Sequence, residues 1–190
     1  MKLVKNILIV VGFFLPAITI QAAPLNTSNI SCDGTCSQSP VGSNLLDFNT
    51  AEKLFLNATK PSYQNLIGKW NMVTSTETLS TMAIQFSEAS QFGGGKSIKA
   101  KFDFAGPPSN PLITQGPYDV QAVGDRICTS TYHYNNQTIN PNVWWNWECK
   151  SLQDQSLLCG LTLRATDPSL VANPNWLNHI LMYVGFSKEN

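Results

Sequence analysis

Residues 82–104 read MAIQFSEASQFGGGKSIKAKFDF, a stretch that predicts a β-hairpin and, through it, the fold class. The three glycines at 93–95 favour a turn between two runs of alternating side chains. In the second run, apolar residues alternate with polar or charged ones: Ile98, Ala100, Phe102 and Phe104 against Ser97, Lys99, Lys101 and Asp103. One face is therefore apolar and the other charged. Folding about Gly94 sets Phe86 opposite Phe102 and makes the two apolar faces coincide, as a correct register requires.

Short β-like runs separated by turn signals continue on both sides of this hairpin. We expect strands at residues 69–76, 79–90, 96–105, 112–122, 126–134, 143–152, 156–164 and 179–187. Consecutive antiparallel strands of this kind predict an all-β fold, an eight-stranded antiparallel up-and-down barrel. Upstream, residues 45–60 (LLDFNTAEKLFLNATK) carry apolar residues near helical spacing and are followed by Pro61, so they predict one N-terminal helix.

Three later strands fit together if their turns lie at residues 135–142 and near Asp154. Cys128 then faces Cys149, and Cys149 faces Cys159. The cysteine face is aromatic and apolar, with Tyr132, Tyr134, Val143, Trp145, Trp147, Leu157, Leu161 and Leu163. The opposite face is mostly polar, with Thr129, Thr131, His133, Trp144, Asn146, Glu148, Lys150, Thr162 and Arg164. A two-residue turn at Gly124-Asp125 would put Tyr118 and Val120 on the wrong face relative to Cys128, so we expect a three-residue turn with a bulge.

The chain has five cysteines, an odd number that allows at most two internal disulfides. We favour Cys128–Cys149, with Cys32–Cys36 as a local bridge and Cys159 as a buried thiol. A disulfide between adjacent strands has demanding geometry. Cys149–Cys159, a bridge from the leader to the barrel, and five reduced thiols therefore remain open alternatives.

The first 22 residues are typical of a secretory signal peptide. Lys2 and Lys5 precede the apolar run Ile7–Ile20, and small residues follow it at Ala22-Ala23. The run is shorter than the roughly 20 residues that a spanning helix needs. We expect a secreted or periplasmic protein without stable membrane insertion, with a flexible Ser/Asn-rich leader over residues 23–44 and a barrel domain over 45–190.

Charge and motifs exclude several function classes. The chain has 12 basic and 12 acidic residues and a formal net charge of zero, so no basic face is expected to bind nucleic acid. No nucleophile elbow, phosphate-binding loop or His-Glu-x-x-His motif is present. His133 and His179 have no partner at metal-ligand spacing. We expect no catalytic residues, no metal and no cofactor.

The segment Leu66-Ile67-Gly68-Lys69-Trp70-Asn71 resembles the Gly-x-Trp signature that opens lipocalins and related calycins. The ending, residues 183–188 (YVGFSK), resembles the last strand of small bacterial lipocalin-like domains. The resemblance implies a small β-barrel in which Trp70 plugs a closed end and the helix at 45–60 covers that end. It also implies that Lys188 packs on Trp70. The long first loop of lipocalins is missing, between about residues 76 and 79.

The aromatic side chains expected inside the barrel are candidate ligand contacts: Phe86, Phe102, Phe104, Tyr118, Tyr132, Tyr134, Trp145 and Trp147. They either stack on a flat or apolar ligand or simply fill a narrow eight-stranded barrel. Glu88 is the one acid predicted to point inward, where it either holds the polar end of a ligand or is solvated at the rim.

Two function classes follow from these residues. The first is a binding protein for a small apolar or aromatic ligand held in the barrel. The second is an interaction protein with a filled barrel that acts through its outer surface, where Trp144 and Trp176 are the candidate contacts for a protein partner.

Overall fold

A computed structural model describes residues 45–77, 79, 81–91, 94–104, 113–135 and 138–189. The helices are α1 (Phe48–Asn57) and α2 (Tyr63–Leu66), with short 3₁₀ helices η1 (Pro168–Leu170) and η2 (Pro174–Trp176). The strands are β1 (Gly68–Ser75), β2 (Met82–Ser90), β3 (Lys96–Phe104), β4 (Ile113–Val123), β5 (Arg126–Asn135), β6 (Thr138–Ser151), β7 (Leu157–Ala165) and β8 (Ile180–Lys188). The expected signal peptide, leader and Cys32–Cys36 bridge lie outside the described residues.

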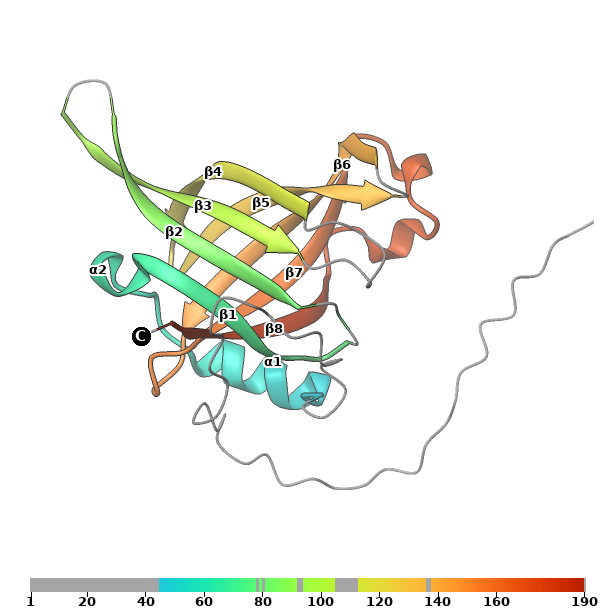
Figure 1. Ribbon diagram of the computed structural model, residues 1–190. Helices are drawn as coiled ribbons and strands as arrows, with labels where there is room; N and C mark the ends of the chain where they lie inside the picture. Colours follow the sequence, from blue (N-terminus) through green and yellow to red (C-terminus); the bar gives the residue numbers. More distant parts are fainter. Residues whose placement is uncertain are drawn as a thin grey trace, which may run out of the picture.

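The eight strands form one closed barrel in sequence order (Figure 1). Every neighbouring pair is antiparallel, and β1 closes the sheet by pairing with β8. The predicted up-and-down barrel is thus confirmed. Among the described residues, no helix is long and apolar enough to cross a membrane.

The β2–β3 hairpin keeps the predicted faces but has a different register. Phe86 lies opposite Ala100, and Ile84 lies opposite Phe102, so the expected pair Phe86–Phe102 is wrong. The strands are shifted by an even number of residues. Such a shift leaves every side chain on its original face, and Ile84, Phe86 and Phe102 are all buried in the barrel.

The β4–β5 turn overturns the expected orientation of β5. Val123 pairs with Arg126, so the turn is the two-residue Gly124-Asp125 turn, without a bulge. Gly124 has φ of +57°, a conformation that glycine adopts without strain. Beyond this turn, the register of β5 shifts against β6, after the pair of Tyr132 with Trp144.

As a result, β5 presents to the core the face that we expected to be outside. Thr129 and Thr131 are buried, whereas Tyr132 is 40% exposed. Ile127, rather than Cys128, lies opposite Cys149. The three-residue turn predicted from the sequence was chosen to keep Cys128 inside, and that assumption is wrong.

The disulfide follows from this orientation. Cys149 is bonded to Cys159 on the neighbouring strand β7, inside the barrel. Among the three cysteines that the structure describes, Cys128 is the one left without a disulfide, and it is half-buried. The favoured Cys128–Cys149 pair is therefore wrong, and the alternative Cys149–Cys159 is the one that forms.

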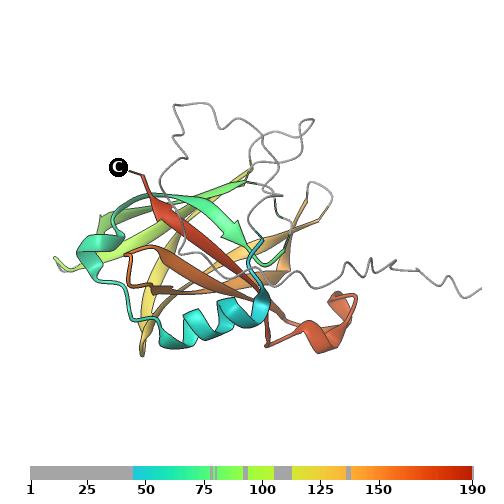
Figure 2. The same ribbon diagram turned by 90° about the horizontal axis from the view of Figure 1, so that it is seen from below.

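Helix α1 lies on the outer wall of the barrel. Asp47 caps its N-terminus by accepting a hydrogen bond from the Thr50 amide at 2.9 Å. Figure 2 shows the helix alongside the barrel wall. Its buried residues, Ala51 and Phe55, pack against Leu158 and Tyr183 on the outer faces of β7 and β8. The helix is shorter than the expected span 45–60, and it does not cover an end of the barrel.

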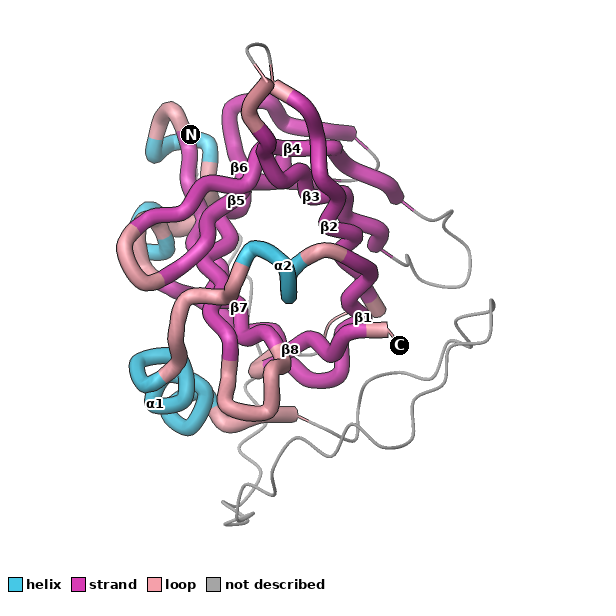
Figure 3. The backbone as a smooth tube through the Cα atoms, turned by 90° about the vertical axis from the view of Figure 1, so that its left-hand side faces the viewer, coloured by secondary structure: helices cyan, strands magenta, loops and turns pink. Residues whose placement is uncertain are grey.

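One end of the barrel is covered by α2 (Figure 3). The buried side chain of Trp70 plugs this end. The indole Nε1 of Trp70 donates to the Leu66 carbonyl at 2.8 Å. Lys188 Nζ lies 5.7 Å from the centre of the Trp70 ring and donates to the Asn65 carbonyl at 2.9 Å. Gly68, at φ of +130°, lets Lys188 pass, since a Cβ there would lie 2.9 Å from Lys188 Cε. Lys188 thus has the place that the family resemblance implies.

Candidate functional site: a pocket at the mouth of the barrel

The half of the barrel next to α2 is filled with side chains. Phe86, Phe102 and Trp147 are at most 1% exposed. The ring centres of Phe102 and Trp147 are 4.9 Å apart, and Trp147 Nε1 donates to Thr131 Oγ1 at 2.9 Å. These side chains pack on one another as a core, as in a narrow barrel filled by its own residues.

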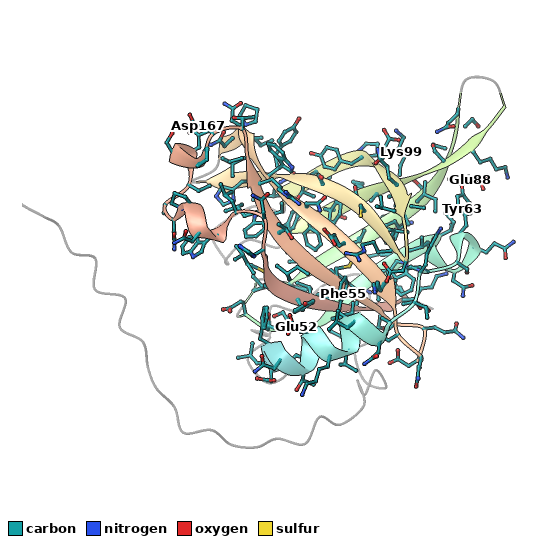
Figure 4. All side chains as sticks on the ribbon, turned by 180° about the vertical axis from the view of Figure 1, so that it is seen from behind. Glu52, Phe55, Tyr63, Glu88, Lys99 and Asp167 are labelled. Atoms are coloured by element: carbon teal, nitrogen blue, oxygen red, sulfur yellow. A yellow bond between two sulfur atoms is a disulfide. The ribbon has the colours of Figure 1, made fainter. Side chains whose placement is uncertain are left out.

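The opposite end of the barrel holds a cavity of about 610 Å³, which we call the mouth pocket. Its lining residues are Glu77, His133, Asn140, Val143, Trp145, Leu163, Leu170, Val171, Ala172, Trp176, Leu181 and Met182. Most of them are apolar. In Figure 4, Asp167 marks the end of the molecule that carries this pocket, and Tyr63 and Glu88 mark the α2 end.

Strand alternation accounts for the inner wall of the pocket. Val143, Trp145 and Trp147 are alternate residues of β6, so all three point inward, and the first two lie beyond the filled core. Leu163 of β7 lies opposite Trp145. Trp145 is half-buried and packs against the core, which makes its ring the floor between the core and the cavity.

The connection between β7 and β8 supplies the second wall. It contains η1 and η2, each started by a side-chain cap: Asp167 accepts from the Ser169 amide, and Asn173 accepts from the Asn175 amide. The Leu177 backbone forms a bridge with Leu163. These bonds hold the connection against the barrel rim, and Trp176 of this connection lines the cavity.

His133 is the titratable ring of the pocket. It stands 6.1 Å from the Trp145 ring, centre to centre. Its Nδ1 is buried and has no hydrogen-bond partner in the described part of the molecule. Burial lowers the pKa of His133, because the charged imidazolium would lose its hydration. The ring is therefore neutral at physiological pH.

The sequence-predicted ligand residues separate into several groups. Trp145 lines the pocket, whereas Phe86, Phe102 and Trp147 belong to the filled core. Phe104 and Tyr118 are partly buried against that core and do not line the pocket. Tyr132 is on the outer face, contrary to expectation. Tyr134 is in β5, and its side chain is outside the described residues.

Glu88 keeps the predicted face of β2, opposite Ile98, but it is exposed to solvent rather than enclosed by the barrel. It is on the protruding end of the β2–β3 hairpin, where its carboxylate pairs with Lys96 Nζ at 2.8 Å and stays exposed (Figure 4). This is the solvated alternative, because an ion pair in water removes the cost of burying a lone carboxylate.

Sequence reasoning placed Trp144 and Trp176 together on the outer surface. Trp176 lines the pocket, whereas Trp144 is half-buried on β6 and its neighbour Trp145 faces the opposite way. A protein partner at Trp144 stays a prediction.

Most of the pocket was not anticipated from the sequence. His133 was assigned to the outer face because the β5 register was wrong. Leu170, Val171 and Trp176 are in a Pro- and Asn-rich connection between strands. Alternation of apolar and polar residues does not predict which side chains face inward in such a segment. The one available signal was their apolar character, which is unusual for a solvated loop.

Within the described part of the chain, no group of three His, Cys, Asp or Glu side chains is placed to hold a metal ion. Comparison with known protein families, with curated proteins and with solved structures finds no match for this chain. The function must therefore be argued from the mouth pocket itself.

Proposed function

We propose that the protein binds a small, mainly apolar ligand in the mouth pocket of a lipocalin-like barrel. The observation that carries this proposal is the cavity of about 610 Å³ with its largely apolar lining. Ligand sites are typically clefts of about 300–1,000 Å³ with apolar walls and a few polar groups. The filled core explains why the ligand would lie at the mouth rather than deep in the barrel.

Two tryptophans from different elements favour a ligand with a flat or aromatic part. Trp145 comes from β6 and Trp176 from η2. Large rigid rings supply much contact area with little loss of side-chain freedom, and they stack on other rings. The polar groups on this cavity are few, so most of the affinity would come from apolar burial.

We also propose that the protein works outside the cytoplasm. The Cys149–Cys159 disulfide supports this, since disulfides persist mainly in oxidising compartments. The sequence of residues 1–22 adds an expected signal peptide.

The proposal is tested by titrating the protein with a panel of lipids and aromatic compounds, followed by native mass spectrometry and calorimetry. Trp176→Ala should weaken any bound compound by about fivefold or more, because a stacking ring is lost. Trp176 is 45% exposed, so its removal should leave the fold intact.

Trp144→Ala is the matched control, because Trp144 does not line the pocket. It should leave the affinity unchanged. If no compound in the panel binds, or if both variants weaken binding equally, the mouth pocket is not the binding site.

A further inference from the structure

The mouth pocket is lined by a negatively charged side chain and by no Lys or Arg among the described residues. Glu77 is the only Asp, Glu, Lys or Arg among the described residues that line it. Its carboxylate has no ion-pair partner in the described part of the chain, where the seven salt bridges all involve other residues. The residues after position 44 whose structure is not described include no Lys or Arg. The pocket thus has an acid without a matching base.

His133 does not supply the missing positive charge. A protonated ring would place a charged N–H at Nδ1, which is buried and has no acceptor. Arg164 is next to the pocket residue Leu163 on β7, but it pairs with Trp144 rather than Trp145, does not line the pocket and donates to the Asn178 side chain. Among the described lining residues, the one formal charge is therefore the negative charge of the exposed Glu77, and two tryptophans lie on the same cavity.

We propose that the ligand is an organic cation, an amine or quaternary ammonium group on an apolar or aromatic body. This inference rests on the proposed function and names the class of ligand. An ammonium group is attracted to the face of an indole ring within about 6 Å. Glu77 adds a carboxylate at the same rim, and the apolar lining accepts the rest of the molecule.

A ligand with a carboxylate is disfavoured by the same features. It would have to give up its hydration without meeting a cation, which is costly. It would also be repelled by Glu77. The pocket therefore discriminates among apolar ligands by the charge of their head groups.

The test compares three compounds that share one skeleton and differ in the head group: phenylbutylamine, phenylbutanol and phenylbutyrate. Calorimetry at neutral pH and low salt gives the three affinities for the full folded protein. We expect the amine to bind on the order of tenfold more tightly than the alcohol, and the carboxylate to bind most weakly.

Glu77→Gln keeps the size of the side chain and removes its charge. It should lower the affinity for the amine by about threefold to fivefold and leave the alcohol unchanged. Glu52→Gln is the matched control, because Glu52 is an exposed acid on α1 outside the pocket lining (Figure 4). It removes the same net charge and should change neither affinity.

Failure of this inference differs from failure of the proposed function. If the alcohol binds as tightly as the amine, or if Glu77→Gln leaves their ratio unchanged, the cation inference is overturned while the binding pocket stands. The same holds if an uncharged compound of the wider panel binds and none of the three does. If nothing binds, the proposed function fails, and the inference fails with it.

Discussion

The buried pair of Trp147 and Thr131 shows how one residue supports the filled half of the barrel. Trp147 is 1% exposed, and its indole N–H has Thr131 Oγ1 as acceptor at 2.9 Å. A buried donor that loses its partner costs more than the bond itself contributes, because its hydration is not recovered. The threonine at 131 is therefore more than a space-filling β-branched residue.

Thr131→Val removes this acceptor and keeps the shape of the side chain. We expect it to lower the free energy of unfolding by about 1–3 kcal/mol. Thr129 offers a matched control on the same face of β5, since its Oγ1 is buried without a partner in the described structure. Thr129→Val should change stability by less than about 0.5 kcal/mol or raise it. Urea denaturation measures both, and equal losses would contradict the argument.

At the scale of the elements, the sequence predicts the positions of the strands well, but it predicts their turns and pairing registers poorly. The alternation in β2 and β3 is regular. The register error of two residues therefore changes which residues pair but leaves each side chain on its predicted face. In β5 both faces carry residues that suit a half-buried strand, namely Thr129 and Thr131 against Cys128 and Tyr132. Only the turn decides between them, and a cysteine assumed to be inside gave the wrong turn.

The site was predicted less well than the fold for a related reason. Aromatic residues mark the interior of a barrel, but which of them meet a cavity depends on where the packing ends. Trp147 is buried in the packed core, whereas Trp145, two residues away on the same face, lines the pocket. The loop that completes the pocket has no repeating pattern, and its position depends on contacts such as the Leu163–Leu177 bridge.

Side-chain contacts, chiefly those of Gln115, join β4 to β5 where their ladder ends. The last backbone pair on that side is Gln121 with Cys128. Further along, the Gln115 amide replaces the ladder: its Nε2 donates to the Tyr132 carbonyl at 3.1 Å, and its Oε1 accepts from the Tyr132 amide at 2.9 Å. Gln115 is 5% exposed. The closure of the barrel wall at this point therefore depends on a buried amide.

Gln115→Leu keeps the bulk and removes both bonds to Tyr132, together with the bond that the Tyr118 hydroxyl donates to Gln115 Oε1 at 3.3 Å. We expect a loss of about 1–3 kcal/mol of stability and faster hydrogen exchange at the Tyr132 amide. Gln121→Leu, an exposed position on the same strand, is the control and should alter neither quantity. Unchanged exchange at Tyr132 in Gln115→Leu would show that the wall is held together by other contacts.

At the scale of the whole molecule, the filled half of the barrel supports the mouth pocket, which is the proposed binding site. The filled half contains the aromatic core, the Trp70 plug and the disulfide, and it fixes the strands on which the pocket is built. The pocket side has a cavity lined by Glu77 and by His133, whose pKa is lowered by burial. A rigid support beneath an open cavity is what a preformed binding site requires.

The contribution of the disulfide to this support can be measured directly, because the bond can be removed by mutation. It closes a loop with a sequence separation of 10 residues. Removing it with Cys149→Ala and Cys159→Ala together should lower the free energy of unfolding by about 2–3 kcal/mol, mainly because the unfolded chain regains freedom. Cys128→Ala is the control, because Cys128 is a free thiol on the outer face. It should cost less than about 1 kcal/mol.

Peptide mapping of the unreduced protein must then join Cys149 to Cys159 and leave Cys128 unlinked to either of them. Burial, with a smaller contribution from Glu148, raises the pKa of Cys128, so at neutral pH its thiolate is scarce and iodoacetamide should label it slowly until the protein unfolds. A peptide that joins Cys128 to Cys149 would mean that β5 has its other face toward the core. In that case Thr131 would no longer meet Trp147, and His133 would leave the mouth pocket, so this one linkage tests the orientation on which the core and the pocket both depend.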